Sequence, residues 1–313
     1  MNVFVLGSYI NANTLTVGQL PKAGESIQAG HLWAEHGGKG LNLAVGMHRM
    51  GLQVNTLLAI GMDAPGQALL DWLQTEGMDT RLVLRMTGAS GFGVGLVAAD
   101  GNNIIAVYPG ANMQLDTYHV QAGSSILCDC QLICAQFEIP DAPILEAFQQ
   151  ARQHGIKTLL NPSPWRVPDP ALLALTDILI LNETEAAVYF GIENAPTLSI
   201  TQWLHLLPTL AWQGELLVVT LAEHGCVALQ RGQSATHAPA WPMTAIDPTG
   251  AGDAFTAGLV YALLHHYPLK SALHFANACG AMVAAQPGVL PALPTFTRVQ
   301  AFMAETLADS FSR

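Results

Sequence analysis

Short apolar runs alternate with longer amphipathic segments along most of the chain. The apolar runs are typical of buried strands and predict strands at 3–7, 54–60, 132–137, 157–161, 178–181, 216–220 and 226–230. The amphipathic segments predict helices at 40–50, 66–76, 143–154, 183–190, 200–212, 253–266, 270–285 and 297–308. Strands that alternate with helices favour a parallel sheet with right-handed crossovers. We therefore predict an α/β fold, a doubly wound and mostly parallel sheet flanked by helices.

Two stretches break this alternation. Segments 14–20 and 26–35, and segments 91–98 and 103–108, have the pattern of strands with no helix between them. The step Ala99-Asp100-Gly101-Asn102 suits a hairpin turn between the last two. We predict that these four strands form a small antiparallel sheet, a β-lid inserted at about 14–36 and 91–108 into a single domain spanning residues 1–313.

Composition and charge exclude several classes of partner. Hydrophobic residues make up 50% and charged residues 11% of the chain, as expected for strands covered on both faces. The formal net charge is −11 and no cluster of Lys or Arg stands out, which argues against nucleic acid or anionic lipid as a partner. The N-terminus lacks the basic region of a signal peptide, and no apolar stretch reaches the roughly 18 residues of a membrane helix. We predict a cytoplasmic protein.

The cysteines do not indicate a disulfide framework, because five is an odd number in a long chain. Cys128, Cys130 and Cys134 are close enough in sequence to be considered as metal ligands. Their flank is apolar and strand-like, and no Cys-x-x-Cys or partner His motif accompanies them. We interpret them as small buried hydrophobes of a reduced protein.

The run Asp247-Pro248-Thr249-Gly250-Ala251-Gly252-Asp253 is the most informative chemical signal. It leads directly into an apolar helix, whose first N–H groups have no partner within the helix and can hold an anion. Glycine leaves such groups accessible. A carboxylate beside an anion site suits a general base that takes a proton from a hydroxyl as the hydroxyl attacks a phosphate. The alternative is structural: the glycines shape a turn, and Asp253 caps the helix.

A second glycine cluster, Gly37-Gly38-Lys39-Gly40, precedes another helix. The Walker pattern is absent, so Lys39 is not a P-loop lysine. The glycines allow a ligand to approach the backbone, and Asn42 offers the donor and acceptor that sugar hydroxyls require. A glycine loop that only enters a helix is the alternative.

Polar residues also follow several predicted strands. Carboxyl ends of parallel strands meet at one edge of a sheet, so these side chains are expected to face one crevice. Taken singly, each has an ordinary alternative as a helix cap, a first-turn carboxylate or a solvated loop charge. The residues are Asn11, Asn13, Glu138, Asn161, Asn182 and Glu185.

Together these segments resemble the ribokinase-like (PfkB) carbohydrate kinases nearly from end to end. The glycine cluster with Asn42 is similar to the first signature of the family, and the 247–253 run to its second. Asn182-Glu183-Thr184-Glu185 is similar to the Asn-x-x-Glu motif, and Leu160-Asn161-Pro162 and Pro109-Gly110-Ala111-Asn112 match in order and spacing. The resemblance implies an ATP-dependent sugar kinase with a lid that closes over a furanose-like sugar.

The resemblance also implies a role for each candidate residue. Asp253 is the expected base, and the backbone N–H groups of Gly250, Ala251 and Gly252 the expected anion hole. Mg²⁺ is expected to bridge the ATP phosphates, with Glu185 acting through water. The expected sugar-binding residues are Asn11, Asn13, Gly37, Gly38, Lys39, Asn42 and Glu138, and the expected nucleotide-binding residues are Asn182, Glu185, Thr220, Gly225 and Asn277.

A monovalent cation, usually potassium, is implied as well. Its expected ligands come from Asp247, Thr249, Val283, Gln286 and Gly288. Ala292 stands where the family offers a serine, so one hydroxyl is missing from this set. A homodimer formed through the lid is a further implication of the resemblance.

The stretch after the first strand departs from the family pattern Gly-Ser-x-Asn-x-Asp, whose last carboxylate binds sugar hydroxyls. Here Gly7-Ser8-Tyr9-Ile10-Asn11-Ala12-Asn13 is interpreted as one residue longer, with an amide in place of the acid. An amide has no charge and makes weaker hydrogen bonds than a carboxylate. We therefore expect a sugar other than ribose, or weaker binding.

Three other functions compete with the sugar kinase. A nucleoside kinase of the same family needs an apolar slot for the base, and Trp33, Phe92 and Tyr108 are candidates, although packing within the lid is the more usual role of aromatics on alternating strands. A non-catalytic sugar or nucleotide sensor retains the fold, but here the base and the glycines are all present. An NAD-linked oxidoreductase requires G-x-G-x-x-G after the first strand, which the chain lacks.

Overall fold

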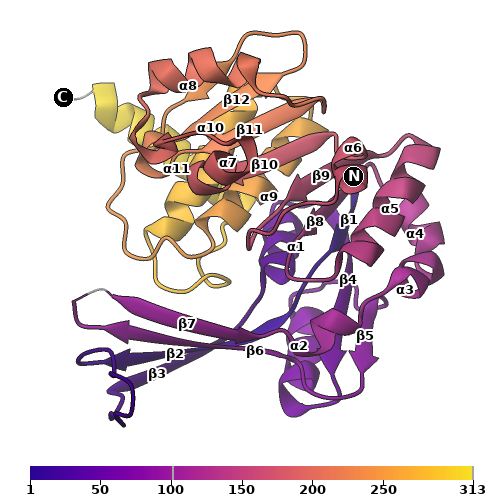
Figure 1. Cartoon of the computed structure of the whole chain (residues 1–313), viewed down its shortest axis with the longest axis vertical. Helices are drawn as coiled ribbons and strands as arrows, with labels where there is room; N and C mark the ends of the chain where they lie inside the picture. Colours follow the sequence, from indigo (N-terminus) through magenta and orange to yellow (C-terminus); the bar gives the residue numbers. More distant parts are fainter. Residues whose placement is uncertain (101, 312–313) are drawn as a thin grey trace.

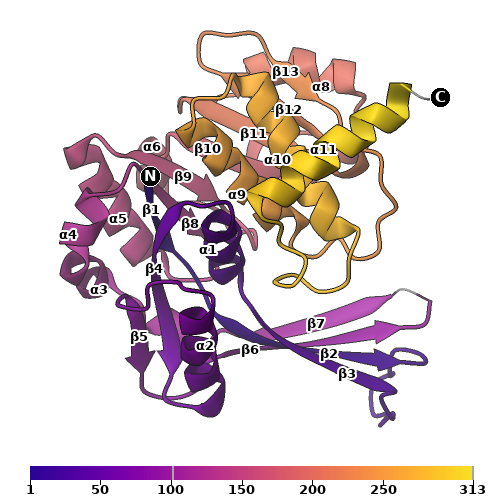
Figure 2. The ribbon, with the colours of Figure 1, turned by 180° about the vertical axis from the view of Figure 1, so that it is seen from behind.

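The computed structural model describes residues 1–100 and 102–311, except for the side chains of 307–311. The body of the protein is a nine-stranded sheet. Helices flank this sheet (Figures 1 and 2). Its strand order is β13-β12-β11-β10-β9-β8-β1-β4-β5. The pairs β11–β12 and β12–β13 are antiparallel and all others are parallel, so the predicted fold class is confirmed. The strands are β1 Asn2–Leu6, β4 Gln53–Gly61, β5 Val83–Met86, β8 Leu132–Gln136, β9 Lys157–Asn161, β10 Ile178–Asn182, β11 Leu216–Thr220, β12 Cys226–Gln230 and β13 Thr236–Ala238.

Each face of the sheet packs against its own set of helices, because side chains alternate along a strand. In β1, Val3 and Val5 join one core with α1, α2, α9, α10 and α11, whereas Phe4 and Leu6 join the other with α3 to α8. The helices are α1 Lys39–Arg49, α2 Ala64–Thr75, α3 Thr117–Ala122, α4 Ser124–Cys128, α5 Asp141–His154, α6 Pro170–Ala174, α7 Glu183–Phe190, α8 Ile200–Leu206, α9 Ala251–Leu264, α10 Leu269–Ala284 and α11 Phe296–Phe311.

The predicted helix over 200–212 is too long. Helix α8 ends at Leu206, and a 3₁₀ turn follows over Leu207–Thr209. Pro208 explains the break, because proline lacks the N–H that a continuing α-helix needs and its ring crowds the preceding turn. The short elements β5, β13, α3, α4 and α6 were not predicted, since three to six residues carry too little periodicity to stand out.

The lid is a separate four-stranded sheet in the order β3-β2-β6-β7 that projects from the body (Figure 1). Its outer pairs β2–β3 and β6–β7 are antiparallel, as predicted, whereas its central pair β2–β6 is parallel. The predicted turn at 99–102 includes Gly101, which lies outside the described residues. The strands are β2 Ile10–Val17, β3 His31–Gly37, β6 Gly91–Ala98 and β7 Asn103–Tyr108.

The end of β1 and the start of α1 touch through two glycines. A Cβ placed on Gly40 would lie 2.1 Å from the Cα of Gly7, so neither position has room for a larger residue. The N–H of Leu41 donates to the carbonyl of Ser8 at 3.1 Å. This contact fixes the second glycine cluster against the carboxyl end of the first strand.

Within the described part of the chain, no helix is both long enough and apolar enough to cross a membrane.

Candidate active site

Asp253 lies in the first turn of α9 and is 4% exposed. Its carboxylate accepts a 2.8 Å hydrogen bond from the Nδ2 of Asn42, which comes from α1, 211 residues away in the sequence. The Nζ of Lys39 lies 3.9 Å from the other carboxylate oxygen. The structure thus brings together the two glycine clusters that the sequence singled out.

The charges around Asp253 oppose the effect of its burial. Burial raises the pKa of Asp253, while the Lys39 ammonium and the Asn42 amide counteract that rise. Asp253 in turn raises the pKa of Lys39 against the effect of burial, and Glu138 and Glu185 raise it further. Lys39 therefore pairs with Asp253 and is also influenced by the charges of Glu138 and Glu185, which the sequence did not reveal.

The turn before α9 presents backbone N–H groups beside this carboxylate. Gly250 has φ 76°, a left-handed conformation that favours glycine, and a Cβ there would meet Val289 at 2.3 Å. The N–H of Ala251 donates to the carbonyl of Pro248 at 3.1 Å, so it is already engaged. Among the described residues, the N–H groups of Gly250 and Gly252 have no acceptor, and the space beside Gly252 is open. Two of the three expected amides are therefore available to an anion.

Glu138 follows β8 and holds the second glycine cluster in place. Its Oε2 accepts hydrogen bonds from the Ser8 hydroxyl and, at 2.7 Å, from the backbone N–H of Lys39. Gly38 has φ 104°, and a Cβ there would lie 2.7 Å from the carbonyl of Ser8. Because only Oε2 is engaged, the other oxygen of Glu138 remains available to a ligand.

Two buried amide side chains at the site have unsatisfied polar atoms. Within residues 1–100 and 102–311, the Oδ1 of Asn42 and both amide atoms of Gln136 have no hydrogen-bond partner. Leaving such a group unpaired costs about 1–3 kcal/mol, so a bound ligand or water is the expected partner. Gln136 ends β8, pairs with Asn161 of β9 and was missed in the sequence. One polar residue at the carboxyl end of an apolar strand was the available signal.

The residues expected at the nucleotide have structural partners of their own. Asn182 and Glu185 form a capping box, with the Asn182 Oδ1 accepting from the Glu185 N–H at 2.8 Å and the Glu185 Oε2 accepting from the Asn182 N–H at 2.9 Å. Thr220 ends β11 beside Asn182. The Nδ2 of Asn277 donates to the carbonyl of Ala238 at 2.9 Å, at the edge strand β13.

Gly225 has φ 87°, and a Cβ there would lie 2.2 Å from the carbonyl of Ala238. The close packing of the backbone explains this glycine without a ligand.

The residues expected around a monovalent cation gather at the carboxyl end of α10. The N–H of Asp247 donates to the carbonyl of Ala284 at 3.1 Å, and the Oδ1 of Asp247 accepts from the Thr249 N–H at 2.9 Å. The N–H of Gln286 donates to the carbonyl of Val283 at 3.1 Å. Gly288 follows, with φ 76°.

The cysteines considered as metal ligands were Cys128, Cys130 and Cys134. Cys130 and Cys134 are buried and Cys128 is half-buried, and all three are free thiols. In the part of the chain that the structure describes, no group of three or more His, Cys, Asp or Glu residues could hold a metal ion.

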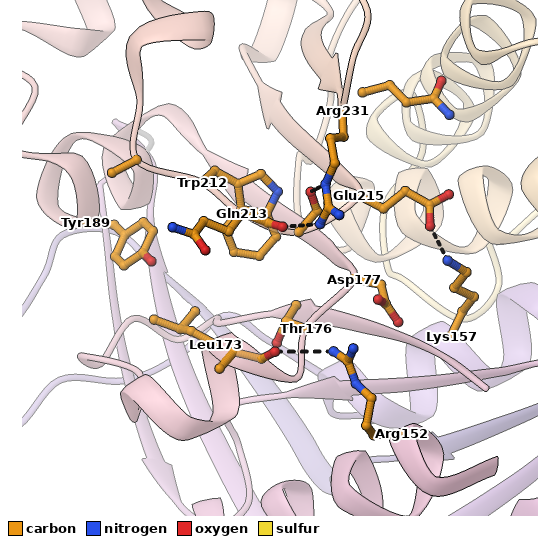
Figure 3. A pocket seen from close by; sticks show the side chains of 14 residues that line it. Arg152, Lys157, Leu173, Thr176, Asp177, Tyr189, Trp212, Gln213, Glu215 and Arg231 are labelled. Carbon is orange, nitrogen blue, oxygen red and sulfur yellow. Dashed lines mark hydrogen bonds and ion pairs between the residues drawn. The ribbon is translucent and has the colours of Figure 1, made fainter. Parts of the chain in front are cut away.

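A cavity of about 830 Å³ lies at the opposite edge of the sheet, where β9, β10 and β11 begin (Figure 3). Its cations have partners within the protein: Lys157 pairs with Glu215, and the Arg152 and Arg231 guanidinium groups donate to backbone carbonyls. Because Asp253 and the glycine clusters lie at the carboxyl ends of the strands, this cavity is separate from the candidate active site.

Residues 1–295 match the pfkB family of carbohydrate kinases. The chain belongs to this family. The ribokinase of Haemophilus influenzae is 30% identical over 292 residues, which cover 93% of this chain and 94% of that protein. The deoxyribokinase of Salmonella typhi is 28% identical over 306 residues, with 97% and 99% covered. The expected enzyme class, an ATP-dependent carbohydrate kinase, is thereby confirmed.

Solved structures of sugar and nucleoside kinases share the fold. The structure of Arabidopsis thaliana ribokinase complexed with ribose and ATP superposes with a TM-score of 0.88 at 26% identity, covering 96% of this chain and 98% of that one. A Burkholderia thailandensis nucleoside kinase in complex with inosine has a TM-score of 0.77 at 22% identity, covering 97% and 98%, and shows the fold alone.

The position of Lys39 predicts a change in the pH dependence of this pfkB kinase. Substitution Lys39→Met removes the charge that favours ionised Asp253, so the pKa of the carboxyl group should rise further. If the enzyme requires ionised Asp253, the acidic limb of the kcat/KM profile should move to higher pH. Lys39→Arg is the control, since it keeps the charge. An acidic limb that stays in place in Lys39→Met would contradict the prediction.

Proposed function

We propose that the chain transfers the γ-phosphoryl group of ATP to a hydroxyl of a furanose-like sugar, with Asp253 as the general base. The observation that carries this proposal is the pairing of a buried carboxylate with available N–H groups of Gly250 and Gly252 at the start of one helix. The carboxylate takes the proton of the acceptor hydroxyl, and the amides and the helix start stabilise charge on the transferring phosphoryl group.

Asn42 and Glu138 would orient the acceptor. The Nδ2 of Asn42 holds the Asp253 carboxylate, which leaves its buried Oδ1 to accept from a sugar hydroxyl. The available oxygen of Glu138 would accept from another. Gly37 and Gly38 would allow the sugar to approach the backbone closely. Correct orientation contributes a large part of the rate in phosphoryl transfer.

Lys39 would neutralise charge between the base and the nucleotide. Its ammonium lies beside Asp253 and within the fields of Glu138 and Glu185. A bound triphosphate adds negative charge that two amides alone cannot balance, so a cation at this point favours both binding and transfer.

The nucleotide would lie against the residues expected there from the sequence, namely Asn182, Thr220, Gly225 and Asn277. Mg²⁺ fits Glu185, because one carboxylate oxygen is held by the Asn182 N–H and the other remains for a metal-bound water. When bound, the ion would neutralise phosphate charge.

The central test is the substitution Asp253→Asn. Loss of a general base costs typically 10²–10⁴-fold in rate, so we expect kcat for sugar-dependent ADP release to fall by about that amount. Sugar and ATP should still bind. Because burial raises the pKa of Asp253, its ionised form destabilises the fold above that pKa, so the unfolding midpoint at neutral pH should not fall. Near-native turnover in a folded variant would rule out the assigned base.

A potassium ion would suit the loop formed by Asp247, Thr249, Val283, Gln286 and Gly288. These residues supply one carboxylate and several carbonyl oxygens close to the turn before α9. The ion would add positive charge near the anion hole.

Replacing potassium with a large organic cation in the ADP-release assay should lower kcat if this site is used. Sodium serves as the control for ionic strength. Turnover that is unchanged in the organic cation would reject the site.

The proposal also specifies the class of acceptor, a sugar rather than a nucleoside. Of the aromatic residues considered for a nucleobase slot, Phe92 and Tyr108 are paired across β6 and β7, whereas Trp33 pairs with Thr14 of β2 and contacts the loop at Gly288. Strand alternation places Trp33 on the opposite face of the lid from the other two. One slot within a single chain therefore cannot use all three, which favours a sugar over a nucleoside.

We also propose that the lid pairs two copies of the chain. Phe92 and Tyr108 share a face with Leu32 and Ile104, and their side chains are 43%, 59%, 57% and 51% exposed. Exposed apolar side chains gathered on one element of a fold are typical of an interface, and the opposite face of the lid also exposes Trp33, Ile105 and Val107. Light scattering should give a dimer, and the charge-introducing substitution Tyr108→Glu should shift it to monomer. A wild-type monomer at working concentration would contradict this proposal.

A further inference from the structure

The lid carries one carboxylate, Glu35 of β3, on a face that can be assigned from the strand register. Glu35 is paired with Ala12 of β2, so their side chains lie on the same face. Asn11 is paired with His36, and these side chains lie on the other face together with Asn13. The two expected sugar ligands of β2 therefore point away from the side to which Glu35 points.

Contacts outside the lid identify the face that looks toward the active site. The carboxylate of Glu35 accepts from the N–H of Val289 at 3.3 and 3.4 Å, in the loop after α10. Ring contacts place His36 against Tyr9 and Trp72 of α2 instead. The face with Glu35 and Ala12 thus looks toward the C-terminal half of the chain, which carries Asp253.

Glu35 is also close to the start of α9. The side chain of Val289 packs against Gly250, since a Cβ on that glycine would lie 2.3 Å from it. One residue therefore separates the Glu35 carboxylate from the turn that would bind the phosphoryl group. Gly37, two positions along β3 and on the same face, belongs to the loop of Lys39.

Glu35 accepts hydrogen bonds from Val289 and Trp33 but, in the described part of the chain, has no countercharge. Among residues 1–100 and 102–311, no Lys, Arg or His forms an ion pair with it. Burial raises its pKa, and the negative charge of Asp247 raises it further, against the hydrogen bonds from Val289 and Trp33. A half-buried carboxylate without a countercharge costs free energy, so a ligand is the expected reason for its presence.

We propose that Glu35 is the sugar-binding carboxylate of the lid and accepts hydrogen bonds from two neighbouring hydroxyls of the acceptor. Counted from Gly7 with no insertion, the acid of the Gly-Ser-x-Asn-x-Asp pattern falls on Ala12. Glu35 is the cross-strand partner of Ala12, so it offers a carboxylate on the same face from β3 rather than from β2. This inference rests on the proposed function and assigns specificity for a vicinal diol to one residue.

The experiment starts by identifying the acceptor in a coupled ADP-release assay with ATP and Mg²⁺ across pentoses, hexoses, deoxy sugars and nucleosides. For the best acceptor, Glu35→Ala should raise KM on the order of 10- to 100-fold, as expected for losing hydrogen bonds to a charged group. The KM for ATP should stay within about twofold. An analogue lacking one of the two hydroxyls should be affected less. Glu35→Gln keeps the shape of the side chain and should raise KM in the same direction, with an unfolding midpoint that does not fall.

Returning a carboxylate to the same face from the partner strand distinguishes a role in sugar binding from a general effect of charge. Because Ala12 and Glu35 are paired, the double variant Ala12→Asp/Glu35→Ala returns a carboxylate to the same face and should recover part of the lost acceptor affinity. Asn13→Asp in the Glu35→Ala background is the matched control, since it adds the same charge to the opposite face and should not restore affinity.

Three results would overturn the proposal. They are an unchanged acceptor KM in Glu35→Ala, a defect confined to the activation constant for potassium, and rescue by Asn13→Asp rather than Ala12→Asp. If the wild-type protein phosphorylates no member of the panel, the proposed function itself fails. That outcome is distinguishable, because it precedes any comparison of variants.

Discussion

The hydrogen bond between Asn42 and Asp253 joins two halves of the protein that are far apart in the chain. It connects α1, which follows the first two strands of the lid, with α9, which begins the C-terminal part of the fold. The bond is buried, and Lys39 supplies the only opposite charge within 4 Å of the carboxylate among the described residues. Every other feature of the site is arranged around this pair, because a carboxylate removed from water needs both a donor and a cation to stay ionised.

The sequence predicted the architecture well where the pattern was long. Strands such as 157–161 and 216–220 and helix 183–190 have the predicted bounds, because a parallel sheet requires apolar runs and its covering helices show a clear period. Short elements such as α6 and β13 carry no such signal. The parallel central pair of the lid depends on how two distant hairpins meet, and no local pattern records that arrangement.

The candidate site was predictable in its motifs but not in its charges. The glycine clusters were recognisable from residue type and spacing, and the structure brings them together at Asp253. The position of Lys39 among three carboxylates depends on tertiary contacts. The orientation of Asn11 and Asn13 depends on where β2 begins: the strand starts at Ile10, earlier than predicted, and strand alternation then turns both amides to the far face. Gln136 was hidden because a single polar residue hardly alters an apolar run.

The contact between Gly7 and Gly40 has a consequence for how acceptor preference can diverge. Because the backbones of Gly7 and Gly40 touch, Ser8, the glycine loop and Asn42 are closely packed against one another. A larger residue there would displace the catalytic side chains together with the acceptor site. The strands of the lid project from the body of the protein (Figure 1), so a side chain on them can change without displacing the glycine loop. Substitutions on the strands of the lid are therefore a more accessible route to a new acceptor than substitutions at Ser8, the glycine loop or Asn42.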